Sequence, residues 1–171
     1  MKIYADENGG YVLRGDGGFA IPLESVTGGG IGTAIPVDAG GGPVTISAVM
    51  PAQTASEGYQ YFAIAPITLA GTVTAVTYVP KGNITGDNTN YRTIAAMHRT
   101  GVNGPVTTFA QIDFLTNVDA TAGVAMTLPW FGGVENRSVA TNEYLYVKSA
   151  KAGATGLADP GGLIVITIEP A

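Results

Sequence analysis

The sequence has 171 residues, of which 46% are hydrophobic and only 12% are charged, with a formal net charge of -5. This length is enough for one domain with a sizeable core and is too short to argue for two. Soluble domains usually carry about 25% charged residues, so this chain exposes unusually little charge. Large uncharged surfaces on a monomer tend to associate, and the composition therefore favours a component of an assembly.

Several classes of partner are disfavoured by the same composition. Lysine and arginine are scattered without a basic run, so we expect no nucleic-acid partner. There are no cysteines, which excludes disulfides and thiolate metal sites. The first twenty residues carry charges and glycines where a secretion signal needs an apolar stretch. The apolar run near the C-terminus is far shorter than the roughly 20 residues that span a bilayer, and we expect no secretory or membrane segment.

Glycine clusters interrupt the first 43 residues, so regular structure there can only be short. Between them lies a quasi-repeat, FAIPL at 19–23 and TAIPV at 33–37, whose prolines cannot donate to a sheet ladder. A flexible linker is the alternative reading, but apolar side chains are costly to leave in water. We therefore predict an extended N-terminal arm over 1–43 that docks on a protein surface. Its anchors are Phe19, Ile21, Leu23, Ile35 and Val37.

From residue 44 onward, runs rich in β-branched and aromatic residues recur between turn signals, which predicts a β-sandwich domain over 44–171. About eight strands are expected, at 44–49, 59–65, 72–79, 91–98, 106–114, 124–129, 143–149 and 163–169. That number fits an all-β, antiparallel, jelly-roll-like sandwich. No long helical period occurs, and the best helical candidate is one or two turns at 51–58.

The C-terminal stretch DPGG at 159–162 fits a type II turn, with proline at its second position and glycine at its third. The strand that follows, LIVITI at 163–168, lacks the alternation of a strand with one wet face. We therefore expect both of its faces to be covered, by a second sheet or by a neighbouring chain.

Little in the sequence indicates catalysis. His98 is the only histidine, and no nucleophile signature accompanies it, so it reads as an ordinary polar residue near a strand end. We expect no catalytic residue, no cofactor and no enzymatic activity. A glycosidase that uses two carboxylates stays open as an alternative. Its candidates at strand ends and turns are Asp113, Asp119, Glu135, Glu143 and Asp159.

The turn TGDNTN at 85–90 offers oxygens from Asp87, Asn88 and Asn90, which could in principle hold calcium. Its spacing does not match the D-x-[DN]-x-[DN]-G loop, and such turns often hydrogen-bond their own backbone instead. We therefore assign no metal ligand in this turn. Whether the turn holds an ion is a question that the sequence does not answer.

The order of segments between residues 70 and 169 resembles small bacteriophage virion proteins of the head-fibre or capsid-decoration kind. The resemblance rests on VPK at 79–81, TGDNTN at 85–90, the strand EYLYVKS at 143–149 and GLADPGGLIVI at 156–166. It implies an all-β homo-oligomer, often a trimer, bound to the major capsid protein on the outer capsid surface of a virion. It brings no catalytic residues, and it leaves out residues 1–43. An arm that fastens this chain to a capsid or to another subunit is our own inference.

The competing interpretation is a phage tail fibre or receptor-binding protein that recognises a host surface glycan. Tyr59, Tyr61, Trp130 and Phe131 are the candidates for a surface on which sugars stack. Aromatic residues in strands lie in the core more often than on the surface, because of the large area that they bury.

Overall fold

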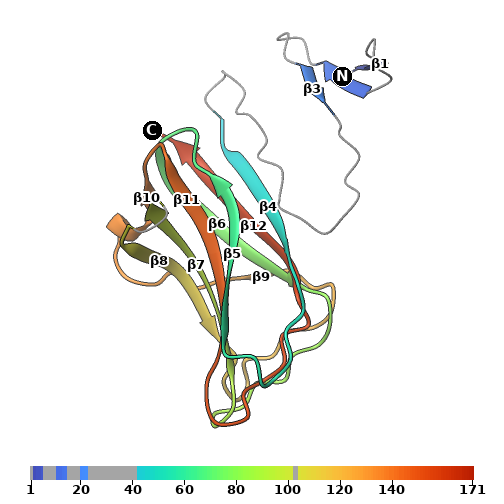
Figure 1. Ribbon diagram of the computed structural model, residues 1–171, viewed down its shortest axis with the longest axis vertical. Helices are drawn as coiled ribbons and strands as arrows, with labels where there is room; N and C mark the ends of the chain where they lie inside the picture. Colours follow the sequence, from blue (N-terminus) through green and yellow to red (C-terminus); the bar gives the residue numbers. More distant parts are fainter. Residues whose placement is uncertain (1, 6–10, 15–19, 23–41, 102–103) are drawn as a thin grey trace. The chain divides into compact units, whose positions relative to one another are not determined.

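The computed structural model describes residues 2–5, 11–14, 20–22, 42–101 and 104–171 (Figure 1). The chain divides into two compact units, 1–30 and 31–171. In the first unit, β1 (Lys2–Ala5), β2 (Tyr11–Arg14) and β3 (Ala20–Pro22) form an antiparallel sheet in the order β1-β2-β3. The sequence pattern does not indicate this sheet. The division of the chain at residue 43 stays a prediction.

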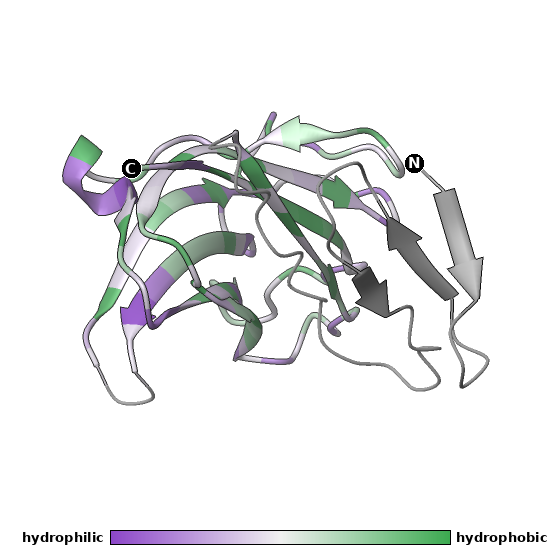
Figure 2. Ribbon diagram, turned by 90° about the horizontal axis from the view of Figure 1, so that it is seen from above, coloured by the Kyte–Doolittle hydropathy of each residue, from purple (hydrophilic) through white to green (hydrophobic). Residues whose placement is uncertain are grey.

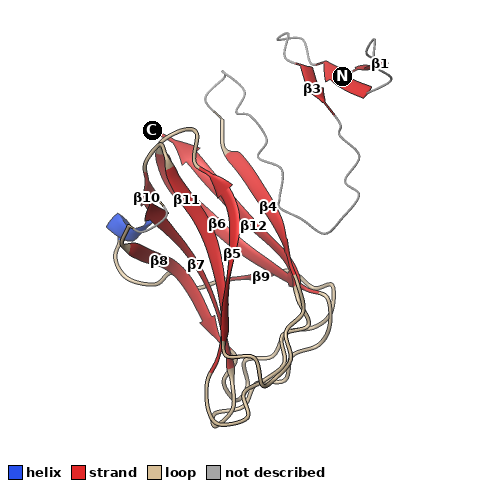
Figure 3. Ribbon diagram, in the orientation of Figure 1, coloured by secondary structure: helices blue, strands red, loops and turns tan. Residues whose placement is uncertain are grey.

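The second unit is built almost entirely of strands, with one short 3-10 helix (Figure 3). The strands and the helix are β4 (Val44–Met50), β5 (Tyr59–Pro66), β6 (Gly71–Pro80), β7 (Arg92–Thr100), β8 (Val106–Asp113), β9 (Met126–Thr127), η1 (Val134–Arg137), β10 (Ser138–Val139), β11 (Glu143–Lys151) and β12 (Gly162–Pro170). The "β12 sheet" has the order β10-β6-β12-β4, with β9 also paired to β6. The "β11 sheet" has the order β5-β11-β7-β8.

The pairing of these strands is that of a rolled-up antiparallel ribbon. The first long strand, β4, pairs with the last, β12, and the second, β5, pairs with the last but one, β11. Inside them, β6 pairs with the short β9 and β10, and β7 pairs with β8. Nested pairs of this kind define a jelly roll. The predicted fold class, an antiparallel all-β sandwich, is confirmed.

Seven of the eight predicted strands coincide with observed strands to within two residues at either end, and two segments differ. Of the segment 124–129, only Met126–Thr127 is a strand. The segment 51–58 is not helical, because Gln53 exchanges backbone hydrogen bonds with Asp159 of another loop. In the segment 51–58, hydrogen bonds to a distant loop thus replaced the helix that the local pattern favours.

The core lies between the two sheets of the second unit. Bands of hydrophobic and hydrophilic residues alternate along the strands (Figure 2), as expected for strands with one buried face. The largest apolar side chains without solvent exposure are Tyr78, Phe109 and Phe114. Residues from every long strand join them in a single cluster. No helix in the described part of the chain is long and apolar enough to cross a membrane.

The predicted type II turn before β12 is supported by the left-handed backbone of Gly161, with φ of 71°. A side chain at this position would also meet the backbone of Met50 and Ala52. In β12 itself, Ile164, Ile166 and Ile168 are buried, whereas Leu163 on the opposite face is 37% exposed. The prediction that both faces are covered therefore holds only for the inner face within the described chain.

Candidate functional site

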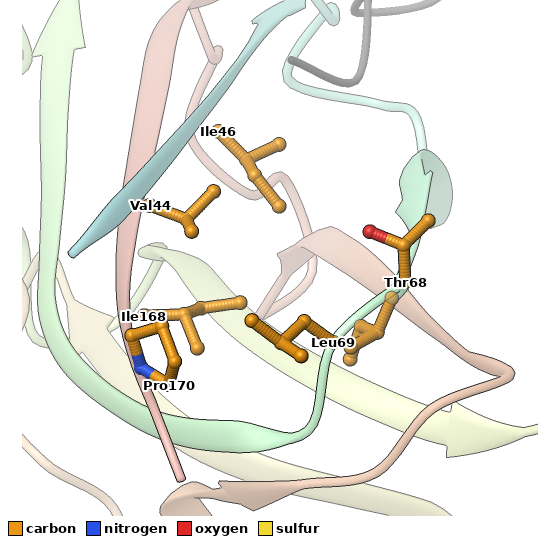
Figure 4. Close-up of a pocket in the computed structure, with 7 residues that line it drawn as sticks. Val44, Ile46, Thr68, Leu69, Ile168 and Pro170 are labelled. Carbon is orange, nitrogen blue, oxygen red and sulfur yellow. The ribbon is translucent and has the colours of Figure 1, made fainter. Parts of the chain in front are cut away.

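The sandwich has a small apolar pocket at one end, between the start of β4, the end of β12 and the loop after β5 (Figure 4). Val44, Ile46, Leu69 and Ile168 line it, and its free volume is about 20 Å³. Roughly 10–15 Å³ is enough for one water, whereas ligand pockets measure about 300–1,000 Å³. The pocket is therefore a packing gap and does not form a ligand site.

His98 lies near the end of β7, as the sequence predicts, and forms a buried pair with Glu143. Its Nδ1 lies 2.8 Å from Oε2 of Glu143, and its Nε2 lies 3.2 Å from the carbonyl oxygen of Asn136. Because both neighbours are acceptors, the ring satisfies them when it carries both protons. The ring also stacks on Phe109, with 6.1 Å between centroids. Both nitrogens are engaged by acceptors, so the arrangement lacks the nucleophile that a catalytic dyad requires.

Glu143 is the acceptor at the centre of this pair. Burial by itself raises the pKa of Glu143, but the backbone amide of Ala140, the charge of His98 and the hydroxyl of Thr100 outweigh it. The net effect is a pKa below the ordinary glutamate value. A glycosidase acid needs a raised pKa instead. Glu143 therefore has the properties of a structural carboxylate.

A second buried polar cluster joins the loops at the other end of the sandwich. Arg92 has no solvent exposure and donates to the carbonyl oxygens of Leu157 (2.8 Å) and Thr54 (2.9 Å) and to Oε1 of Gln53 (2.9 Å). Burial lowers the pKa of Arg92, and the nearby carboxylate of Asp159 opposes that shift. Arginine remains charged in proteins, so these three acceptors stabilise a buried cation.

Asp159 forms the anionic half of the same cluster and is only 1% exposed. Its carboxylate accepts hydrogen bonds from the hydroxyls of Tyr78 (3.1 Å) and Ser149 (2.6 Å) and from the amide of Gly161 (2.8 Å). Burial, together with this carboxylate, raises the pKa of Tyr78 strongly. All of these groups are enclosed, and their arrangement fastens the loops around β12.

The other three carboxylates proposed for a glycosidase are Asp113, Asp119 and Glu135, and they lie in three different segments. Asp113 accepts from the hydroxyl of Thr93, and Asp119 accepts from the amide of Gly86. Glu135 lies in the first turn of η1. Glu143 and Asp159 thus lie in two separate hydrogen-bonded clusters. Among the described hydrogen bonds, none joins two of the five carboxylates as the acid and the base of a glycosidase would require.

The turn at 85–90 uses its oxygens within the protein. Oδ1 of Asp87 accepts from the amides of Thr89 (2.6 Å) and Asn90 (2.7 Å), and these bonds lower the pKa of Asp87. The side-chain oxygens of Asn88 and Asn90 accept from the amides of Thr116 and Thr155. No cluster of three metal-ligating side chains occurs among the residues that the structure describes.

The outer face of the β12 sheet is the first of two extended surfaces. Its central rows hold no charged residue, because the cross-strand partners there are valine, leucine, threonine, serine and alanine. One row is wholly apolar: Leu163 pairs with Val49 on one side and with Val79 on the other. Val49 is 77% exposed and lies on β4, the edge strand of the sheet.

The apolar row Val49–Leu163–Val79 also lines an open groove of about 380 Å³. The other walls come from the ends of β4 and β6 and from the turn before β12, where Pro51, Pro80 and Pro160 lie. Lys81 is the only charged residue in this lining. The groove is thus an apolar depression beside an edge strand that pairs on one side only, among the described strands.

The outer face of the β11 sheet carries the second surface, the "tyrosine stripe" formed by Tyr59, Tyr61, Tyr144 and Tyr146. The register pairs Tyr59 with Ala150, Tyr61 with Lys148, Ala63 with Tyr146, and Pro66 with Tyr144. The four rings therefore occupy four successive rows along β5 and β11. Tyr59 and Tyr61 are 66% and 50% exposed.

Two cations flank the tyrosine stripe. Nζ of Lys148 lies 5.6 Å from the ring centroid of Tyr59 and 5.7 Å from that of Tyr61. The guanidinium of Arg99 lies 5.5 Å from the ring of Tyr146. Tyr144, Tyr146 and Lys148 alternate with buried residues in EYLYVKS, which is a period-2 signal visible in the sequence. These three residues and Arg99 were nevertheless not among the candidates for a sugar-binding surface expected from the sequence.

The two other aromatic candidates, Trp130 and Phe131, are 41% and 48% exposed and so lie on the surface as well. Their segment hydrogen-bonds to Phe109 and Gln111 of β8, at the opposite edge of the sheet from β5. Trp130 is covered by the guanidinium of Arg137, at 4.8 Å from its centroid. The four aromatic candidates thus divide between the two edges of one sheet.

The predicted arm anchors are placed only in part. Phe19, Leu23, Ile35 and Val37 lie outside the described residues. The backbone of Ile21 lies in β3, opposite Leu13 of β2. The docking role of these five residues remains a prediction.

The described residues of the second unit form a jelly-roll sandwich, and no further layer among them covers the outer faces of its two sheets. No protein-family model matches the sequence, and no curated protein matches it. One similar solved chain comes from the structure of infectious bursal disease virus Gx strain. It is 11% identical, the match covers 95% of this chain and 42% of the viral chain, and the TM-score is 0.35.

Proposed function

We propose that this chain is a virion structural protein, of the capsid-decoration or head-fibre kind, that binds the outer capsid surface as a homo-oligomer and is not an enzyme. The observation that carries the proposal is the outer face of the β12 sheet, whose central rows hold no charged residue and whose apolar row is formed by the exposed Val49 and Leu163 with the half-buried Val79. Solvent-exposed apolar rows beside an edge strand with a free side favour pairing with another chain. We expect a trimer, in which the apolar row of one copy packs against a different surface of the next copy, because the interfaces of a three-fold ring are heterologous.

If the apolar row forms the subunit interface, charged residues in it should prevent self-association. Replacing both Val49 and Leu163 by lysine places two charges in the apolar row, and desolvating them costs several kcal/mol in an interface. The double variant should be monomeric at concentrations where the natural chain is a trimer, as measured by light scattering coupled to size exclusion. Thr116→Lys, an exposed loop substitution, is the control and should keep the oligomer. An oligomer unchanged in the double variant would refute this interface.

If the N-terminal arm holds the chain on the capsid, its removal should abolish capsid binding without breaking the oligomer. Three arms on one trimer act together, because the first contact raises the effective concentration of the others. Deleting residues 1–37 should therefore abolish cosedimentation with capsids of the same virus. The deleted chain keeps all of β4 to β12, so it should remain a folded oligomer. Capsid binding that survives the deletion would remove the arm from the proposal.

A second candidate function, recognition of a host surface glycan, is favoured by the tyrosine stripe on the β11 sheet. The stripe lies on a different sheet from the apolar row, so the two functions are compatible in one protein.

A further inference from the structure

We propose that the tyrosine stripe is a binding site for a linear polysaccharide that carries carboxylate groups. The site consists of Tyr59, Tyr61, Tyr144 and Tyr146 with the cations Arg99 and Lys148. This inference rests on the second candidate function, glycan recognition by the tyrosine stripe, and names the class of glycan. It does not depend on the capsid role, because that role concerns the apolar row on the other sheet.

The geometry of the stripe favours an extended polymer over a compact ligand. Successive rows on one face of a strand are two residues apart, which is about 6.7 Å. The four tyrosines occupy four such rows, so the stripe is about 20 Å long. Pairs of rings contact along it, with centroids 5.7 Å apart for Tyr59 and Tyr61 and 6.5 Å apart for Tyr144 and Tyr146.

The surface beneath and beside the rings is a closed platform. Met97 and Ala95 of β7 pair with Tyr146 and Lys148 on this outer face, yet they are only 3% and 2% exposed. The longer side chains around them therefore cover the sheet. The rings above it are not coplanar, because the planes of Tyr59 and Tyr61 are inclined by 74° and those of Tyr144 and Tyr146 by 49°. Successive sugars of a polymer would therefore meet ring faces and ring edges in turn, without entering a cavity.

Tyrosine suits a sugar because each ring offers an apolar face and a hydroxyl. A sugar ring likewise has a face of C–H groups and a rim of hydroxyls. Stacking buries the two apolar faces together, while the tyrosine hydroxyls and the sugar hydroxyls stay at the edge, where they can hydrogen-bond. The exposure of Tyr59 and Tyr61 leaves their rings accessible for this contact.

The cations indicate that the polymer is acidic. The ion pair in the described part of the chain joins His98 and Glu143, so neither Arg99 nor Lys148 has a carboxylate within 4.0 Å there. A guanidinium and an ammonium group both bind carboxylates through charge-assisted hydrogen bonds, so carboxylates on the polymer would pair with these two cations.

The density of charge favours an acidic polysaccharide over a nucleic acid. A DNA strand in a duplex carries one phosphate about every 3.4 Å, so about six phosphates would face the 20 Å stripe. The stripe offers only two cations for them, and the chain has a net charge of -5. A polysaccharide with a carboxylate on some of its sugars matches two cations spaced along four rows.

The test measures binding of the full chain to four acidic polysaccharides that differ in sugar and linkage, namely alginate, polygalacturonate, hyaluronan and polysialic acid. Affinity electrophoresis and surface immobilisation both report the dissociation constant. We expect retention by at least one of them, with affinity that falls at least threefold between 50 mM and 300 mM salt. Dextran, which is neutral, should bind at least tenfold more weakly.

Two variants locate the site. Tyr59→Ala combined with Tyr61→Ala removes exposed rings, and Arg99→Gln combined with Lys148→Gln removes the charges while keeping polar side chains. Each should weaken binding at least tenfold, with an unchanged circular dichroism spectrum and an unchanged oligomeric mass. Trp130→Ala combined with Arg137→Gln is the matched control, because it removes an exposed aromatic ring and its cation from the other edge. The control should bind like the natural chain.

Four outcomes overturn the proposal. They are retention by none of the four polymers, equal retention of dextran, loss of binding in the Trp130 and Arg137 control as large as in the stripe variants, and binding of polyglutamate or a thymidine 20-mer at least as tight as that of the polysaccharide. The last outcome would assign the stripe to an acidic peptide or to a single-stranded nucleic acid instead.

Discussion

Replacing Arg92 by methionine should lower the free energy of unfolding by about 3–5 kcal/mol, although methionine keeps an unbranched apolar stem. Arg92 is fully buried and supplies hydrogen bonds to Leu157, Gln53 and Thr54, which belong to two different loops. Methionine leaves the carbonyl of Leu157 and Oε1 of Gln53 without this donor, whereas the carbonyl of Thr54 keeps the amide of Glu57. An orphaned buried polar group costs about 1–3 kcal/mol. Urea denaturation, with the slope compared between the two proteins, measures the loss.

A second substitution separates the loss of the hydrogen bonds from the loss of packing. In the Arg92→Met background, Gln53→Leu removes one of the orphaned acceptors. The loss of unfolding free energy in the double variant should therefore be about 1 kcal/mol smaller than the sum of the losses in the two single variants. Arg137→Met removes an arginine whose recorded contact is the ring of Trp130, and it should cost under about 1 kcal/mol. A similarly small cost for Arg92→Met would contradict the structural role of the cluster.

Replacing Glu143 by glutamine should cost about 2–4 kcal/mol at pH 5.5, because it removes the charged acceptor of a buried pair. Glu143 accepts from His98, Ala140 and Thr100, and one of its oxygens becomes an amide donor in the variant. The remaining oxygen can still accept from His98 and Ala140 while the amide faces the hydroxyl of Thr100, so the variant loses the charge that strengthens these hydrogen bonds. The free energy of unfolding in urea again measures the effect.

The same residue determines part of the acid sensitivity. The folded-state pKa of Glu143 is lowered, so its stabilising contribution is fully present above the unfolded value of about 4.3 and is lost as the pH falls through the folded pKa. The stability difference between the natural chain and Glu143→Gln should thus stay constant between pH 5.5 and 5 and shrink towards pH 3. Glu169→Gln, at an exposed position, should cost less than about 0.5 kcal/mol. A difference that stays constant down to pH 3 would show that Glu143 does not stabilise the fold through its charge.

Both clusters show where reasoning from the sequence stops. His98 and Glu143 are 45 residues apart, and Arg92 and Leu157 are 65 apart. In the sequence, each reads as an ordinary polar residue at a strand end or in a loop. Only the pairing of β7 with β11, and of the loops at 51–58 and 152–161, brings the partners together.

The tyrosine stripe has a similar origin. Alternation in EYLYVKS already places Tyr144, Tyr146 and Lys148 on one face of a strand. The continuation of that line through Tyr61 and Tyr59 depends on the register between β5 and β11, including its irregularity at Leu145 and Tyr146. A shift of register by one residue would send the rings to opposite faces.

The sequence by itself determined the all-β class, the positions of seven strands and the turn at Gly161, because these depend on local propensity, alternation and the backbone freedom of glycine. Tertiary structure alone decided which strands are neighbours, and with that the jelly-roll order, the two buried polar clusters and the two exposed faces. Such contacts join residues far apart in the chain, and their free energy comes from burial and register that no short stretch of sequence contains.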